Sequence, residues 1–441
     1  MTAHDDVAPD PVLTAALERL RLDDADAAED AAAALDWMVG AAGLAALNQA
    51  GLQQFLWYEL PFKWLGGPAR QRAVADALGR AFDHAGLHRY AAMCRSDTTA
   101  EVVTAFAVDP VDGFERFRAA HRRSGVVPPD VELLTWGDLM GPVEFEAFWS
   151  SAMTLELAVE SGSLAVGGRR AAREGAELVT AHLTRPRPER FGETLLQAIE
   201  TERITAWFDD PLRRARAQLL EPVVPSLLAA EPVPPSAGRA LRPLARLLDL
   251  AVAGDAHLTP SGRLTGATAA AVVGRRPGRG EPDAPGAAEL RRLAVAARLA
   301  RVQGRRLVAT RRGEAVAGSP AGRWAAAAGH LATGAGTDPE VAELVLALVL
   351  DAAPGREVSV DQLVRPVQIA TAEGPGGRGG RPRPDDEVRA DVLAVLAVVR
   401  ALGGLRAGSL DDRAPLRLTA AGGPLLRAAL RRRATAPRAL A

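Results

Sequence analysis

The sequence contains a single cysteine, Cys94, and a single lysine, Lys63, among 441 residues. One cysteine excludes an intramolecular disulfide and a zinc site built from clustered cysteines. Arginine therefore carries almost all of the positive charge, and its abundance beside frequent alanine and glycine is typical of high-GC coding. Because such coding raises the arginine content throughout a chain, the amount of arginine alone does not indicate a binding function.

Aromatic residues make up only 4% of the chain, and they are unevenly distributed. Every Phe and Tyr, and every Trp except Trp324, lies at or before Phe208. The proline-rich stretch EPVVPSLLAAEPVPPSAG follows at 221–238, and such a composition is typical of a stiff connector. We therefore expect an aromatic-rich helical domain over 1–220 and a connector over 221–238, with further domains beyond, since a chain of this length holds about three.

Long apolar runs are absent. The longest, Val392–Val399, is far shorter than the roughly 20 residues that a membrane-spanning helix needs. The first residues, MTAHDDVAPDPV, are acidic where a signal peptide is basic. We therefore expect a cytoplasmic protein that makes no contact with a membrane.

The chain also has no G-x-S-x-G or H-E-x-x-H sequence, the motifs of common hydrolases and zinc enzymes. A glycine-rich stretch at 162–170 lacks the Lys-Ser/Thr pair of a P-loop, which disfavours nucleotide hydrolysis. His84 and His88 have the i, i+4 spacing of helical metal ligands, but Gly86 between them predicts a helix end, and no third ligand is suitably spaced. We therefore predict neither a metal site nor a cofactor.

Glutamates are the remaining candidates for chemistry. Glu156 and Glu160 are four residues apart, and Glu144 and Glu146 lie upstream in the same predicted helix. Paired carboxylates can act as a general acid and base or bind a cation. No nucleophile accompanies them, so we assign no catalytic residue, and an enzyme that uses these helical carboxylates is kept as an alternative.

The most informative segment is Glu289–Gly318, ELRRLAVAARLARVQGRRLVATRRGEAVAG. Its first part places apolar side chains at i, i+3, i+4 and i+7, namely at Leu290, Leu293, Ala294 and Ala297. This spacing predicts a helix with one buried face. Arg291 and Arg298, seven residues apart, would then share a neighbouring face of that helix.

The periodicity changes around Gln303-Gly304. Residues 299–302 and 306–309 flank this glycine-containing turn, which predicts a β-hairpin with a short loop. Thr310 comes next, and a threonine hydroxyl at this position can accept from the free N–H groups of a following helix. The segment therefore predicts a helix, a hairpin and a second, Thr-capped helix.

The last third of the chain repeats this order. A helical run at 388–402 precedes a possible hairpin at 405–418 with a looser tip, and Thr419-Ala420-Ala421-Gly422 precedes a closing helix at 425–433. A third T-x-x-G, Thr259–Gly262, follows a predicted helix at 241–252, and its proline favours a first helical turn there.

A helix, a two-stranded wing and a capped helix, together with the L-x-T-x-x-G ending at 416–422, resemble the core of winged helix-turn-helix domains. The resemblance covers about 240–435 and implies one winged-helix-like module over 239–318 and another over 319–441. Such modules bind nucleic acid or serve for dimerisation and protein docking. Separately, the pattern FL-x-x-x-LP-x-K-W at 55–64 resembles soluble proteins of high-GC bacteria, a resemblance that implies no activity.

Charge is divided between the two halves of the chain. From residue 221 onward, 31 Arg stand against 21 Asp and Glu, whereas the earlier part has 22 basic and 33 acidic residues. Eight arginines gather in the first winged unit: Arg291, Arg292, Arg298, Arg301, Arg305, Arg306, Arg311 and Arg312. By contrast, the runs at 341–350 and 388–402 are apolar on nearly every face, so we expect these helices to be buried and the second module to serve for packing or pairing.

We therefore predict a mostly helical protein with an N-terminal α-helical domain followed by two winged-helix-like modules. The leading hypothesis is a non-catalytic regulatory or adaptor protein whose basic half contacts nucleic acid or an acidic partner. The binding residues would be Arg291, Arg298, Arg305, Arg306, Arg311 and Arg312. A protein scaffold or homodimer with buried wings is the second hypothesis, and the carboxylate enzyme is the third.

Overall fold

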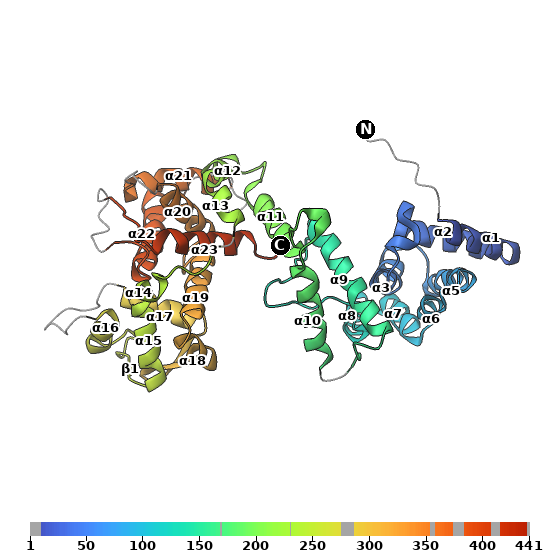
Figure 1. Cartoon of the computed structure of the whole chain (residues 1–441), viewed down its shortest axis with the longest axis horizontal. Coiled ribbons are helices and arrows are strands. Elements are labelled where there is room, and N and C mark those ends of the chain that lie inside the picture. The colour runs from blue at the N-terminus through green and yellow to red at the C-terminus, as the bar shows by residue number, and fades with distance from the viewer. Residues whose placement is uncertain are drawn as a thin grey trace. The chain divides into compact units, whose positions relative to one another are not determined.

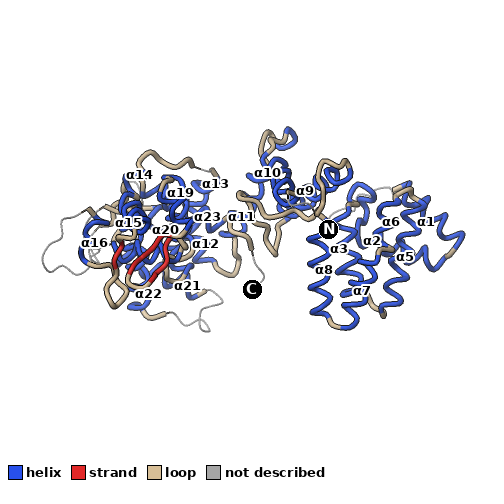
Figure 2. The backbone as a smooth tube through the Cα atoms, turned by 90° about the horizontal axis from the view of Figure 1, so that it is seen from below, coloured by secondary structure: helices blue, strands red, loops and turns tan. Residues whose placement is uncertain are grey.

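The computed structural model describes residues 10–167, 170–229, 231–274, 286–352, 358–373, 383–406 and 415–438. It is mostly helical, with one small antiparallel sheet of three strands (Figures 1 and 2). The chain forms two compact units: unit 1 comprises Met1–Ile199 and Pro437–Ala441, and unit 2 comprises Glu200–Ala436. None of the helices in the described residues is long and apolar enough to cross a membrane.

Unit 1 is built from helices in chain order. They are α1 (Pro11–Asp23), α2 (Ala25–Val39), the 3-10 segment η1 (Gly40–Ala46), α3 (Gln49–Gln54), the π-turn η2 (Phe55–Glu59), α4 (Leu60–Lys63), α5 (Pro68–His84), α6 (His88–Cys94), α7 (Asp97–Val108), α8 (Pro110–Ser124), α9 (Pro142–Glu160), α10 (Ala171–Thr184), η3 (Pro188–Arg190) and the start of α11 (Leu195–Phe208).

The aromatic stretch after Gly51 forms the centre of the largest core cluster in unit 1. Phe55, Leu56 and Leu60 are fully buried there. A proline inside a helical run usually ends the helix, but Pro61 does not. The chain widens into a π-turn, in which the Leu60 N–H donates to the Phe55 carbonyl, and continues into α4. Pro61 then lies in the first turn of α4, where its missing N–H costs no hydrogen bond.

Unit 2 contains the remaining elements. They are the rest of α11, α12 (Arg214–Leu220), η4 (Glu221–Val223), α13 (Val224–Leu228), α14 (Ala237–Ala240), α15 (Arg242–Ala253), β1 (Ala256–His257), α16 (Gly266–Val273), α17 (Ala287–Ala296), β2 (Ala300–Gln303), β3 (Arg306–Ala309), α18 (Arg311–Ala317), α19 (Pro320–Ala332), α20 (Pro339–Asp351), α21 (Val360–Ala372), α22 (Asp385–Ala401) and α23 (Gly422–Ala434).

The proline-rich segment at 221–238 is part of the core of unit 2. Val223, Leu227 and Ala237 are buried in that core, and two of the prolines occupy first turns of the short helices η4 and α13. Prolines at such positions start helices instead of separating domains. The unit therefore begins at Glu200, some 20 residues before the boundary that composition suggests.

The two expected modules share one hydrophobic core. A single cluster of buried side chains extends from Ile204 to Ala434. Helices α20 and α22, which the sequence predicts to be buried, contribute many of its members. The division at 318/319 thus separates two similar segments of one folded unit.

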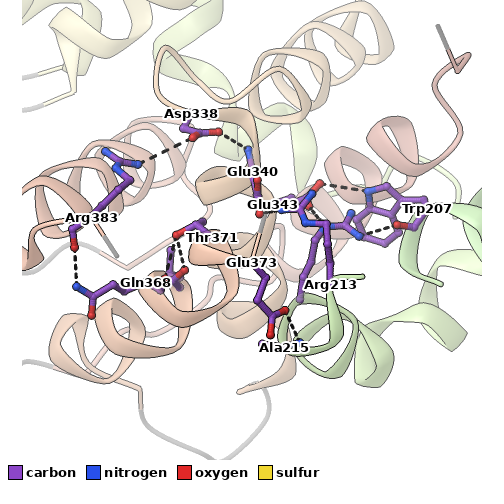
Figure 3. A network of polar contacts seen from close by, with 12 residues as sticks. Trp207, Arg213, Ala215, Asp338, Glu340, Glu343, Gln368, Thr371, Glu373 and Arg383 are labelled. Atoms are coloured by element: carbon purple, nitrogen blue, oxygen red, sulfur yellow. Dashed lines mark hydrogen bonds and ion pairs between the residues drawn. The ribbon is translucent and has the colours of Figure 1, made fainter. Parts of the chain in front are cut away.

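Glu343 is the main polar exception inside this core. This residue of α20 is only 1% exposed, and its carboxylate accepts from Arg216 Nε at 2.6 Å, from Trp207 Nε1 at 3.2 Å, and from Arg433 (Figure 3 shows its surroundings). Arg216 also donates to the Trp207 carbonyl. Three segments distant in sequence, α11–α12, α20 and α23, therefore converge on one carboxylate, which explains why the residues after Ile199 belong to unit 2.

Replacing Glu343 tests this convergence. We expect Glu343→Gln to lower the free energy of unfolding of unit 2 by about 3 kcal/mol, because it leaves the buried Arg216 and the half-buried Arg433 without this countercharge. Urea unfolding followed by circular dichroism measures the change. Glu314→Gln is the control, since Glu314 is exposed and has no ion pair with a described residue; equal losses in the two variants would contradict the role given to Glu343.

Candidate nucleic-acid interface

The basic segment belongs to a compact set of elements ordered α15, β1, α16, α17, β2, β3 and α18 (Figure 1). Its sheet has the strand order β1-β3-β2, and both pairings are antiparallel. Leu307 at the centre of β3 is fully buried and pairs with Ala256 on one side and Val302 on the other. Arg301 and Arg306 project from the opposite face, because side chains alternate along a strand.

The predicted hairpin is confirmed. Gln303 pairs with Arg306, so the loop is the two residues Gly304 and Arg305. Gly304 has φ 58°, and Arg305 is not among the residues with positive φ. A positive φ at only the first central residue is the pattern of a type II′ turn, which favours glycine there and matches the twist of the flanking strands.

Thr310 closes the segment on itself. Its hydroxyl donates to the Arg298 carbonyl at 2.7 Å, and its backbone N–H donates to the Leu299 carbonyl at 2.9 Å. The same hydroxyl accepts from the Gly313 N–H at 3.1 Å, which confirms the predicted helix cap. The end of α17 and the start of α18 are thereby held together at the base of the hairpin.

Gly313 allows this closure. A Cβ built on Gly313 would overlap the Leu299 carbonyl oxygen. Only glycine leaves room for the first turn of α18 to approach the chain at the start of the hairpin.

The second copy makes the same contacts. The Thr419 hydroxyl donates to the Gly403 carbonyl at 2.6 Å, and the Thr419 N–H donates to the Gly404 carbonyl at 3.0 Å. A Cβ on Gly422 would overlap the Gly404 carbonyl oxygen, as at Gly313. Isolated bridges join Leu416 to Val358 and Leu418 to Leu405, which is the β1-β3-β2 order again. The tip of this second hairpin, expected at 409–414, lies outside the described residues.

The third T-x-x-G has a different structure. Thr259–Gly262 forms a turn in which Gly262 has φ 77°, and a bridge between Leu258 and Leu264 closes that turn. The following helix, α16, is capped by Thr265. The expectation of a helix beginning at Pro260 is therefore wrong, because the bridge pairs the chain on both sides of the motif.

Arg291 and Arg298 do not share a helix face. Arg291 lies on α17 and is half-buried, with its Nε buried and unbonded among the described residues. Helix α17 ends at Ala296, and Arg298 has φ 54°, a left-handed conformation outside the helix. The chain reverses there to enter β2, as the second copy does at Gly403 with φ 71°. The prediction that Arg291 and Arg298 share one face of a helix is therefore wrong.

Six exposed arginines nevertheless surround the hairpin: Arg298, Arg301, Arg305, Arg306, Arg311 and Arg312. We call them the hairpin cluster. Within the part of the chain that the structure describes, none of these side chains has a hydrogen bond or ion pair. The closure at Thr310 brings Arg298 next to the start of α18, and the short turn places the remaining members on or beside one hairpin. Arg292, also in this region, pairs with Glu289 at 3.0 Å.

Two arginines of α23 are used internally in unit 2. Arg431, near the C-terminus, pairs with Glu200 at 2.6 Å, and Arg433 pairs with the buried Glu343. Both are half-buried. Two of the three arginines in the run 431–433 therefore hold unit 2 together.

The start of α17 is covered. A Cβ on Gly286 would lie 3.3 Å from that of Ala401 at the end of α22. Helix α22 is itself buried on one side and carries acidic residues in its first turn. A recognition helix enters a DNA groove with an open, polar N-terminal turn. Because α17 is covered at its start and α22 is acidic there, the hairpin is the better candidate for contact with nucleic acid.

The glutamates of the enzyme hypothesis have structural partners. Glu156 accepts from the Gln49 N–H at 2.7 Å and from the Tyr90 hydroxyl at 2.7 Å, and it pairs with Arg89 at 3.2 Å. Burial, followed by the bond to Glu156, raises the pKa of Tyr90. Glu144 is fully buried and accepts from a backbone N–H. Glu144 and Glu156 thus join elements of unit 1.

The two histidines with metal-ligand spacing face different carboxylates. His84 ends α5 near Asp23, and His88 starts α6 beside Asp83. Gly86 between them has φ 76°, so the predicted helix end is confirmed. No group of three metal-ligating side chains is found among the described residues.

No family model matches the chain, and neither a curated protein nor a solved structure matches it.

The glycine at the base of the hairpin offers a test of the closure. We expect Gly313→Ala to destabilise unit 2 by about 2 kcal/mol or more, because the new methyl group overlaps a backbone carbonyl that cannot rotate away. Gly318→Ala is the matched control, since nothing lies within 4 Å of a Cβ there and its backbone conformation is helical. Thermal unfolding measures both; a Gly313→Ala protein as stable as the control contradicts the proposed close packing.

Proposed function

We propose that this protein is a non-catalytic regulatory or adaptor protein that binds double-stranded nucleic acid through the hairpin cluster, and that 239–318 and 319–441 are winged-helix modules. The single observation that carries the proposal is the set of six exposed guanidinium groups that have no acidic partner among the described residues. Supporting it, the element order and the strand order of the first module are those expected for a helix-turn-helix with a wing.

The local sequence strengthens the electrostatic argument. Residues 298–312 contain six arginines and no aspartate or glutamate. Like charges held this close repel one another, and a polyanion relieves the repulsion while releasing its own counterions. Guanidinium groups also bind phosphate oxygens in a bidentate manner. Phosphates are regularly spaced along a duplex, whereas the carboxylates of an acidic protein surface are not.

The proposed contact is largely independent of base sequence. A two-stranded ribbon fits a groove of duplex DNA, but the start of α17 packs against α22, so few side chains are placed to read base edges. Affinity would come from phosphates, with the hairpin fixing the position of the protein on the duplex.

The second module has a different role in this proposal. Its helix α22 is buried against the first module and begins with Asp385, Asp386 and Glu387, which repel phosphate. We therefore assign it to packing, as its apolar sequence suggests. The first hairpin, by contrast, is exposed in unit 2 and accessible to a ligand.

Charge reversal at the tip of the hairpin tests the proposal. We expect Arg305→Glu combined with Arg306→Glu to weaken binding to a random-sequence 20-base-pair duplex by at least about 10-fold at low salt, because two phosphate contacts become repulsive. Fluorescence anisotropy of a labelled duplex measures the dissociation constant.

The matched control is Arg239→Glu combined with Arg365→Glu. Both residues are exposed in unit 2, on α14 and α21, and neither has a partner among the described residues. The two double variants have the same net charge, so only the location differs. Similar losses in both would refute a defined hairpin interface, and a wild-type protein that binds polyglutamate as tightly as the duplex would indicate an acidic protein partner instead.

A further inference from the structure

We infer that unit 1 contains a binding site for an uncharged, flat aromatic small molecule, in a groove between α2–α3 and α9. The groove has a volume of about 570 Å³, within the usual range for small-molecule sites. Its apolar lining comes chiefly from Trp37, Met38, Phe145, Trp149 and Met153. This site is independent of the hairpin cluster and of the function proposed for it.

The walls of the groove are unusually exposed apolar side chains. Phe145 is 53% exposed, Trp37 52% and Met153 40%. Phe145 and Trp149 pack edge to face with ring centroids 5.7 Å apart, so this part of the wall is formed without a ligand. Aromatic rings and flexible thioethers together can enclose a planar ring on both faces. Covering this surface provides the free energy for binding.

The charges at the groove are compensated. Glu59 accepts from Trp37 Nε1 at 2.5 Å and pairs with Lys63 at 3.4 Å, while Glu146 pairs with Arg190 at 3.0 Å. A charged ligand would therefore lose its hydration without gaining a free countercharge. This favours a neutral molecule over a cation or an anion.

The polar side chains limit the hydrogen bonds that a ligand can make. The Asn48 amide caps α3 and donates to the Ala46 carbonyl, and the Ser150 hydroxyl bonds to His182. Gln54 lines the groove, is half-buried, and has no hydrogen-bond partner among the described residues. A ligand with one or two polar atoms on an otherwise apolar ring system matches this lining.

Two dyes with the same ring system test the inference on the full-length protein. N-phenyl-1-naphthylamine is neutral, and 8-anilinonaphthalene-1-sulfonate adds a negative charge to the same rings. We expect the neutral dye to bind saturably to one site and about 10-fold more tightly than the anionic dye, as followed by dye fluorescence and by tryptophan quenching. Equal affinity for the two dyes, or fluorescence that never saturates, overturns the proposal.

Variants then locate the site. Phe145→Ala combined with Met153→Ala should weaken binding of the neutral dye by at least about 10-fold, since two apolar walls are lost. Both residues are exposed, so the fold should persist, and circular dichroism checks this. The control is Phe191→Ala combined with Leu65→Ala, which are 103% and 98% exposed and lie outside the groove. Unchanged affinity in the first variant, or equal weakening in the control, refutes the assignment.

Discussion

The carboxylate of Glu343 is the interaction on which unit 2 depends. It is buried on α20 and accepts from two arginines and a tryptophan that come from separate parts of the chain. Burying such charges is costly unless geometry and hydrogen bonding satisfy them. Removing the carboxylate would leave the buried Arg216 uncompensated, so the packing of α11, α12 and α23 depends on it.

The arginines of unit 2 named above fall into two groups, those with an acidic partner and those without one among the described residues. Arg216, Arg431 and Arg433 form internal ion pairs, and Arg213 pairs with Glu340 close by (Figure 3). The hairpin cluster, by contrast, has no such partners among the described residues. Arginine is frequent throughout this chain, so its abundance does not identify a binding site. Pairing is more informative, because a guanidinium group without an acidic partner among the described residues is available to a ligand. The proposed function rests on this difference and not on the total charge.

The local features of the structure could be predicted from the sequence. The hairpin turn at Gly304 and the cap at Thr310 depend on residues within a few positions of each other, and the repeat at Thr419 reproduces their contacts. The left-handed conformation of Arg298 is not predicted by its residue type, because arginine rarely adopts it. The equivalent position in the second copy is Gly403, and a glycine there does indicate the end of a helix.

Features that depend on distant contacts could not be predicted. The boundary at Glu200 reflects contacts between distant residues, such as the pairing of Arg216 with Glu343, which are 127 residues apart, and no local pattern marks it. Likewise, the groove in unit 1 brings Trp37 to Phe145 from different helices. Composition alone does not distinguish a connector from a series of helix starts, and the prolines of 221–238 include such starts.

The most direct test of the central claim is the salt dependence of duplex binding by the wild-type protein. If the hairpin cluster contacts phosphates, a plot of log K against log salt concentration for a random-sequence duplex should be linear with a slope between about −3 and −5, as expected for three to six neutralised phosphates. A slope near zero, or no measurable binding at low salt, would contradict the account.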